Sequence, residues 1–366
     1  MKQISVILFI LISITSISQS HQADSLIFKG VEAHEKMQYI IALTYFDSAL
    51  NMNGKNNLAL IEKAITLDAL GELDESKDLC EKAIEIEPNI EEEYITYGNV
   101  LDKIGKTRQS IEVYDQGLEI FPSSVGLLYN KGIALIRKKK LIEAETYFQK
   151  VLMVDINHYN SYRAIAAINY DKNMALSLLC YMKLNIEYPN SEFAEENYSR
   201  VQEIHHRWVV QENNETTIYI PKKIIKSSYK RITYGITYEN NFEFILLAIA
   251  EGGALEYKPS YDLLNIAELT EIRLRLICSF LTKDRDNEYG FYWELLGNYF
   301  ISLAKSDNTE AASYLFCLWS IDTEVNEWVM NNKEKIQRFN DWISISNSDF
   351  STFMKDKNGG SIPPRD

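Results

Sequence analysis

Histidine, cysteine and carboxylate side chains are the groups in this sequence that could do chemistry. Glu203, His205 and His206 form the tightest cluster and could in principle hold a metal ion. Adjacent histidines on a helix point about 100° apart, so these two do not easily face one ion. No H-E-x-x-H or comparable spacing supports them. We therefore expect no metal site, and we interpret both histidines as surface residues beside an aromatic helix.

Paired carboxylates are common but carry no sign of catalysis. Glu268 with Glu271, and Asp284 with Asp286, lie in polar stretches, whereas an acid–base pair needs surroundings that push the two pKa values apart. The sequence contains no P-loop, G-x-G-x-x-G or G-x-S-x-G motif. The expectation is a protein without catalytic residues and without a cofactor.

The four cysteines are widely spaced and lie in apolar segments with helical character. We interpret Cys80, Cys180, Cys278 and Cys317 as buried thiols that act as small hydrophobic side chains. A disulfide is the alternative, but a chain of 366 residues does not need one to form a core. There is no C-x-x-C motif, which argues against thioredoxin-like redox chemistry.

Net charge and the N-terminal segment bear on the partners and the location of the protein. The formal charge of −14 argues against a nucleic-acid partner and against docking on an anionic membrane. Residues 1–18 have a basic start, an apolar run over 4–12 and the small residues Ser16 and Ser18, the pattern of a signal peptide. The prediction is an exported protein, periplasmic or secreted, with no integral membrane segment in the mature chain.

An uncleaved membrane anchor is the alternative reading of the N-terminal segment. The apolar stretch from Ile4 to Ile17 is interrupted by serines and a threonine. A bilayer span needs about 20 mostly apolar residues, so the signal peptide is favoured.

A constant interval of about 34 residues organises the first half of the chain. Small residues recur at this interval at Gly30, Ala64, Gly98 and Gly132. Three more series keep the same interval: Ala42, Ser76, Ser110 and Ala144; Phe46, Cys80, Tyr114 and Phe148; and Ala49, Ala83, Gly117 and Val151. The pattern is explained by units of two antiparallel helices, which must stack on neighbouring units because they cannot bury their apolar faces alone. Only small residues fit where these helices cross closely.

These residues resemble the tetratricopeptide repeat family, which is small at the eighth, twentieth and twenty-seventh repeat positions and aromatic at the twenty-fourth. Four repeats match over 23–56, 57–90, 91–124 and 125–158, and a degenerate fifth follows over 159–191 with a shortened internal turn. Gly54 and Ile156 replace the usual proline, and Val151 replaces a small residue. The resemblance implies an α-solenoid over 23–191.

The resemblance also implies a concave groove, lined by the first helix of each repeat, that binds a peptide or a partner helix. The residues it would present are Glu62, Ile65, Asp68, Ile95, Asn99, Asp102, Tyr129, Asn130 and Arg137. Asn99 and Asn130 match two positions of a carboxylate clamp, but Ile95 stands where its lysine should be. The acidic run 91–93 and the basic run 137–140 are explained as solvated helix ends.

The second half is predicted to be a helical domain over 192–350, followed by a disordered tail over 351–366. Apolar spacing predicts helices over 192–211, 242–251, 263–281, 291–304, 311–321 and 325–343. Between them, residues 216–238 are rich in Thr, Ile and Tyr, and either a short β-hairpin or irregular helix fits this composition.

The sequence therefore predicts an all-α protein: a solenoid followed by a helical C-terminal domain. The leading hypothesis is an exported scaffold that binds a protein segment in the solenoid groove. A second is that the C-terminal half is a catalytic or ligand-binding domain whose substrate the repeats recruit, and a third is homotypic stacking of solenoid ends.

Overall fold

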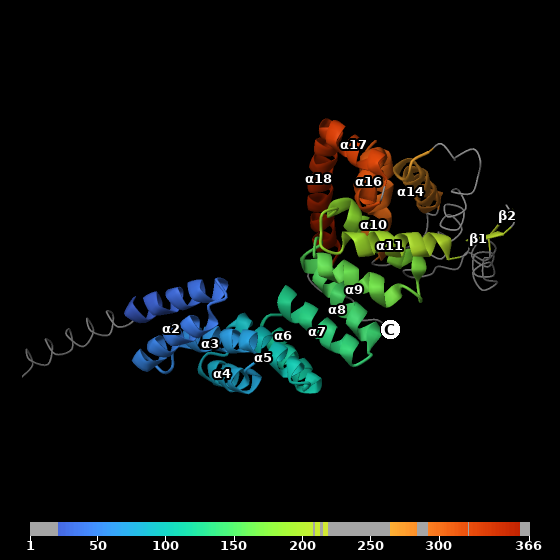
Figure 1. Cartoon of the computed structure of the whole chain (residues 1–366). Coiled ribbons are helices and arrows are strands. Elements are labelled where there is room, and N and C mark those ends of the chain that lie inside the picture. Colours follow the sequence, from blue (N-terminus) through green and yellow to red (C-terminus); the bar gives the residue numbers. More distant parts are fainter. Residues whose placement is uncertain are drawn as a thin grey trace, which may run out of the picture. The chain divides into compact units, whose positions relative to one another are not determined.

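A computed structural model describes residues 21–207, 209–212, 215–218, 264–283, 292–320 and 322–358 of the chain (Figure 1). The predicted signal peptide (1–18), the helix predicted over 242–251 and most of the tract 216–238 lie outside these ranges. The chain forms two compact units, Met1–Tyr147 and Phe148–Asp366, and the division falls within helix α8.

The first unit is a series of antiparallel helix pairs, as an all-α solenoid requires. It contains a helix over residues 21–35, α2 (Tyr39–Met52), α3 (Asn57–Leu70), α4 (Leu73–Ile86), α5 (Glu91–Lys103), α6 (Thr107–Ile120), α7 (Val125–Arg137) and the start of α8 (Leu141–Val154). Each helix in this series has thirteen or more residues, and consecutive helices contact one another from α2 to α7. The predicted all-α class and the solenoid are confirmed.

The turn inside each repeat uses the same backbone conformation, and it recurs at the repeat interval. Gly71 and Gly105 have φ angles of 82° and 88°, and Met37 and Lys139 hold the equivalent places at 58° and 59°. In the second repeat the turn also ends α3, because the Gly71 and Glu72 amides both donate to carbonyls of its last turn. Left-handed backbone at this point reverses the chain so that the second helix runs back along the first.

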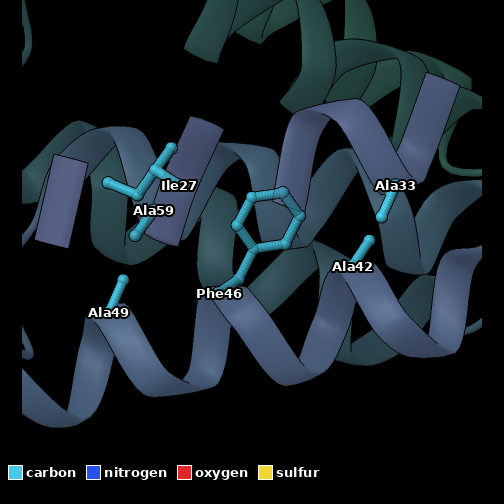
Figure 2. Close-up of a cluster of buried hydrophobic side chains, with 6 residues drawn as sticks. All are labelled: Ile27, Ala33, Ala42, Phe46, Ala49 and Ala59. Carbon is cyan, nitrogen blue, oxygen red and sulfur yellow. The ribbon is translucent and has the colours of Figure 1, made fainter. Parts of the chain in front are cut away.

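Large side chains on the second helix fill the space that small residues leave on the first. A methyl group on Gly30 would overlap the Phe46 ring, and one on Gly98 would overlap the Tyr114 ring. Figure 2 shows the Phe46 ring between the Ala33 and Ala42 pair and the side chains of Ile27, Ala49 and Ala59. The repeat interval predicted from the sequence therefore reflects side-chain packing: the small residue on the first helix leaves space for the ring that lies sixteen positions later on the second helix.

The second unit continues with helices and contains one small β-hairpin. After α8 come α9 (Tyr159–Asn169), α10 (Met174–Glu187), α11 (Ala194–His206), strands β1 (Val209–Glu212) and β2 (Glu215–Ile218), α14 (Ile266–Lys283), the π-helical turn η3 (Trp293–Gly297), α15 (Asn298–Lys305), α16 (Thr309–Phe316), the 3-10 turn η4 (Cys317–Trp319), α17 (Thr323–Asn331) and α18 (Lys333–Asn358). β1 and β2 pair antiparallel, with Val209 opposite Ile218 and Glu212 opposite Glu215.

The fifth helix pair keeps the repeat geometry with a shorter turn. Ser177 Oγ donates to Ala166 O at 2.9 Å, as Ser76 Oγ donates to Ala64 O at 2.7 Å in the second repeat. The spacing between serine and carbonyl is eleven residues instead of twelve. The bond preserves the crossing of α9 and α10 although the register of the earlier repeats is lost.

A similar hairpin recurs near the C-terminus. Asp307, between α15 and α16, has a φ of 59°, like the repeat turns. Ala312 and Phe316 follow it at the spacing by which Ser76 and Cys80 follow Gly71, and both are buried. Phe300 stands where the other hairpins have a small residue, which explains why the repeat is hard to detect in the sequence.

Several predicted elements in the second unit have other bounds than expected. The helix predicted over 192–211 ends at His206, and the chain then enters β1, because Val209-Val210 and Thr216-Thr217 favour extended backbone. The hairpin therefore begins earlier than the predicted range of 216–238. The helix predicted over 325–343 is two helices separated at Asn332, whose backbone is not helical (φ −113°, ψ 40°).

The predicted disordered tail is wrong for its first part. Helix α18 runs to Asn358, past the expected limit of 350. Residues 351–358 contain neither glycine nor proline, which is compatible with a continuous helix. Within the described ranges, none of the helices is long and apolar enough to cross a membrane.

Candidate functional site

The first helices of successive repeats lie side by side in the first unit, and polar side chains link them. His34 Nδ1 and Thr66 Oγ1 are 2.9 Å apart, and Lys103 Nζ lies 2.6 Å from Asp68 Oδ2. One repeat further, Arg137 forms the equivalent ion pair with Asp102. The two ion pairs are one repeat apart, so the repeat generates them, and they connect the helices that line the predicted groove.

Eight of the nine predicted groove residues are half-buried, and Arg137 is exposed. The structure brings Asp102 and Arg137 together as an ion pair and pairs Asp68 with Lys103, which the sequence analysis did not single out. Asn99 accepts a hydrogen bond from Tyr114 Oη at 2.8 Å. Neighbouring side chains therefore hold these groups in position. That a partner protein binds to them stays a prediction.

The two predicted aliphatic groove residues also pack into the repeat cores. Ile65 packs against the cluster of Ile61, Ala64 and Cys80. Ile95 extends over Gly126 of the next repeat, where a Cβ atom would lie 2.6 Å from Ile95 Cδ1. Each aliphatic side chain thus supports the helix packing and leaves only part of its surface for a ligand.

Two exposed apolar side chains on the first helices of repeats one and two were missed by sequence reasoning. Phe28 is 71% exposed and Leu58 is 53% exposed. Phe28 precedes Glu62 by one repeat interval, and Leu58 precedes it by about one helical turn, so both belong to the face that carries Glu62. The repeat interval could have located Phe28, because it occupies in the first repeat the place of Glu62 and Asn130.

Carboxylates accompany these side chains. Burial raises the pKa of Glu62, and the nearby charge of Glu92 raises it further. Asp24 occupies the position of Leu58 and Glu92 in the first repeat. We call Asp24, Phe28, Leu58, Glu62 and Glu92 the N-terminal groove patch.

A cleft of about 490 Å³ opens elsewhere in the first unit, between α6, α7 and the start of α8. Lys131 is buried at its base, where its ammonium group donates to Tyr147 Oη at 2.6 Å and pairs with Asp115. At the rim, Arg108 pairs with Glu112 and Lys140 with Glu143. The opposite charges of this cleft largely compensate one another.

A smaller cleft of about 240 Å³ lies in the second unit around the start of α16. Two of its carboxylates are ion-paired: Glu271 with Arg275 and Glu310 with Lys335, each at 2.6 Å. Thr309 Oγ1 donates to Glu271 at 3.1 Å. The cleft is polar, and its described lining residues include carboxylates and basic groups but no histidine.

One of the two histidines of α11 does not lie where it was predicted. His205 is 2% exposed, so the expectation of two surface histidines is wrong for it. His206 Nδ1 lies 2.8 Å from Gln202 O, one helical turn back. Among the described residues, no group of three or more histidine, cysteine or acidic side chains could hold a metal ion.

All four cysteines are buried thiols rather than disulfides, which confirms their interpretation as small hydrophobic side chains. Burial raises the pKa values of Cys80, Cys278 and Cys317 to about 12. Thiols in this state are poor nucleophiles, because the thiolate is the reactive form.

Known proteins resemble the chain over its repeats. The family described as tetratricopeptide repeat matches residues 59–90 and 125–158. The small glutamine-rich tetratricopeptide repeat-containing protein 2 of Mycosarcoma maydis is 25% identical over 118 residues, 32% of this chain and 33% of that protein. The alignment thus spans about a third of the relative's length.

Two solved structures that match part of the chain are tetratricopeptide repeat proteins. TTC0263, a thermophilic tetratricopeptide repeat protein of Thermus thermophilus, is 18% identical, with a TM-score of 0.43 over 49% of this chain and 98% of its own. YrrB, a tetratricopeptide repeat protein with an unusual peptide-binding site, is 19% identical, with a TM-score of 0.39 over 48% of this chain and 92% of its own.

The family match covers the second and fourth predicted repeats, and the first and third carry the same small and aromatic residues at the same interval. Turn conformation and ring packing follow that interval in the structure. The chain therefore carries tetratricopeptide repeats in its first half.

Proposed function

We propose that this protein is an exported scaffold whose groove, lined by the first helices of the repeats, holds a segment of a partner protein. Its repeats and its relatives support a role in protein–protein interaction. The binding groove, the partner and the export step are the parts that this proposal adds.

The observation that carries the groove proposal is the set of half-buried side chains along adjacent first helices. Neighbouring groups fix Asn99, Asp68 and Asp102 in position before any partner arrives. A preorganised polar surface loses little side-chain entropy on binding, which favours recognition of a defined segment.

Affinity capture tests the groove. The protein from residue 19 onward would be used to capture partners from its own cells, beside a variant with Asn99→Ala, Tyr129→Ala and Asn130→Ala. A matched control carries Glu85→Ala, Gln116→Ala and Glu119→Ala, three exposed positions on second helices. We expect a partner with the native protein and the control, and its loss with the groove variant while circular dichroism shows all three folded. Capture that survives the groove substitutions would rule out this groove as the binding surface.

Export is tested separately on the full-length protein. We expect fractionation to place the protein outside the cytoplasm, and N-terminal sequencing to begin at Gln19. A start at Met1 in a membrane fraction would instead favour the uncleaved anchor. Light scattering of the purified mature protein decides whether copies stack on one another, because homotypic assembly would give a mass above that of one chain.

A further inference from the structure

The N-terminal groove patch combines exposed apolar surface with carboxylates. Phe28 and Leu58 expose most of their side chains on the first helices of repeats one and two. Single exposed apolar residues need no explanation, but these two lie on the groove face of neighbouring helices, next to Glu62. An apolar anchor of the partner could cover both.

The negative charge of the patch is not neutralised by the described residues. Asp68 and Asp102, further along the groove, are paired with Lys103 and Arg137. Asp24, Glu62 and Glu92 have no ion-pair partner among the described residues, and Glu62 and Glu92 lie close enough to repel each other. A cation placed between these two carboxylates would remove the repulsion.

We propose that the N-terminal groove patch binds a cationic partner segment, in which a large apolar side chain covers Phe28 and Leu58 while flanking Lys or Arg residues face Asp24, Glu62 and Glu92. This inference rests on the proposed groove function and specifies its chemistry. A second copy of the chain fits the patch poorly, because an isologous contact would place the same carboxylates opposite one another.

The charges predict how binding depends on conditions. Ion pairs at a partly exposed surface weaken as salt screens them, so affinity for a cationic segment falls between low and high ionic strength. The apolar contact is not screened and remains at high salt. Binding should therefore decline with salt without disappearing.

Two labelled peptides test the inference by fluorescence anisotropy. Each has about four helical turns and one leucine stripe, and the remaining positions are lysine in one peptide and glutamate in the other. A scrambled lysine peptide with dispersed leucines controls for non-specific attraction to a chain of charge −14. We expect the striped lysine peptide to bind the full mature protein at least about tenfold more tightly than either of the others.

Matched variants locate the contact. Glu62→Lys with Glu92→Lys should weaken binding of the lysine peptide by about tenfold or more and strengthen binding of the glutamate peptide. Glu85→Lys with Glu119→Lys makes the same change of net charge at exposed sites outside the patch and should have little effect. Phe28→Ser should weaken binding by about tenfold, whereas Ile142→Ser, at a residue that is 62% exposed, should not.

The outcomes separate this inference from the groove proposal. Equal losses in the patch and control variants, a preference for the glutamate peptide, or no binding of any peptide would overturn the cationic segment. If capture from cells is still lost in the Asn99, Tyr129 and Asn130 variant, the groove function stands and only its assigned chemistry fails. If the native protein captures nothing, the groove function itself fails, whatever the peptides do.

Discussion

Glu93 is a buried carboxyl group in the third repeat with an incomplete set of hydrogen bonds. Asn57 Nδ2 donates to Glu93 Oε1, while Glu93 Oε2 and Asn57 Oδ1 have no hydrogen-bond partner among the residues that the structure describes. The pKa of Glu93 is raised to about 7, because burial outweighs the lowering effect of the Asn57 hydrogen bond and the charge of Glu87 contributes a smaller rise. A protonated Glu93 can donate from Oε2 to Asn57 Oδ1, which would satisfy both acceptors with one proton.

We predict that the protein loses stability as the pH rises from about 4.5 to about 7. In this range the native state keeps a proton on Glu93 that the unfolded state, with a pKa near 4.5, has released. The free energy of unfolding therefore falls across the window, by roughly 3 kcal/mol in total, and this contribution is constant above pH 7. Glu93→Gln should flatten the profile, because its amide can donate to Asn57 Oδ1 at any pH. Urea unfolding at several pH values would show this; a profile unchanged from that of the native protein and of the exposed control Glu85→Gln would refute it.

Gly98 gives a second prediction at this scale. Gly98→Ala places a methyl group into the Tyr114 ring and should destabilise the protein by about 1–3 kcal/mol. Gly54→Ala is the matched control, because its nearest neighbour would be Leu50 O at 3.7 Å. Thermal unfolding should show a lower midpoint only for the first. Adding Tyr114→Leu to Gly98→Ala should recover part of the loss if the ring is its cause.

Among the elements, the repeat turns show how one backbone conformation tolerates different residues. Glycine holds the left-handed position at 71 and 105, whereas Met37 and Lys139 hold it in the first and fourth repeats. A left-handed conformation costs a residue with a Cβ atom about 1 kcal/mol. The other contacts of the hairpin must offset that cost.

We therefore predict that Lys139→Gly stabilises the protein by up to about 1 kcal/mol. Gly71→Ala should destabilise it by a similar amount, since no neighbouring atom lies within 4 Å of its Cβ position and only the backbone angle is at issue. Denaturant midpoints of the two variants should move in opposite directions. If both midpoints moved in the same direction, solvation or the entropy of the unfolded chain would outweigh the cost of the left-handed backbone.

The sequence predicted elements best where one packing rule repeats. Small residues facing a ring sixteen positions later locate the hairpins without knowledge of the structure. The second half of the chain lacks that redundancy. A break such as Asn332, or the passage from α11 into β1, depends on local backbone preferences that apolar spacing does not report. At the candidate site, the interval indicated which helix face to examine, but the ion pair of Asp68 with Lys103 depends on side-chain geometry across two repeats.

At the scale of the whole molecule, the C-terminal helices close the end of the helix series in the second unit. Every residue of α10 from Ala175 to Ile186 is buried. Helix α16 packs on α10, the Tyr198 and Phe316 rings are 5.4 Å apart, and Trp319 Nε1 donates to Pro189 O at 2.6 Å. Residues on the two sides of the predicted boundary at 191/192 thus pack extensively against one another. That the two segments have separate functions stays a prediction.

We predict that ending the mature chain after Arg207 destabilises what remains, because it exposes apolar surface of α10. The fragment should aggregate or unfold at a lower temperature than the full chain, by about 10 °C or more if several kcal/mol are lost, at roughly 2–4 °C per kcal/mol. Size-exclusion chromatography and circular dichroism would measure this. A monomeric fragment with an unchanged midpoint would show that the repeats are stable without their cap.

The four buried thiols can report how often the structure around each of them opens to solvent. Cys80 lies in the first compact unit, and Cys180, Cys278 and Cys317 lie in the second. An alkylating reagent cannot reach them in the closed structure, so the rate at which each is modified measures how often its surroundings open. Mass spectrometry of timed samples would then rank four places along the chain by local stability, with no substitution or added label.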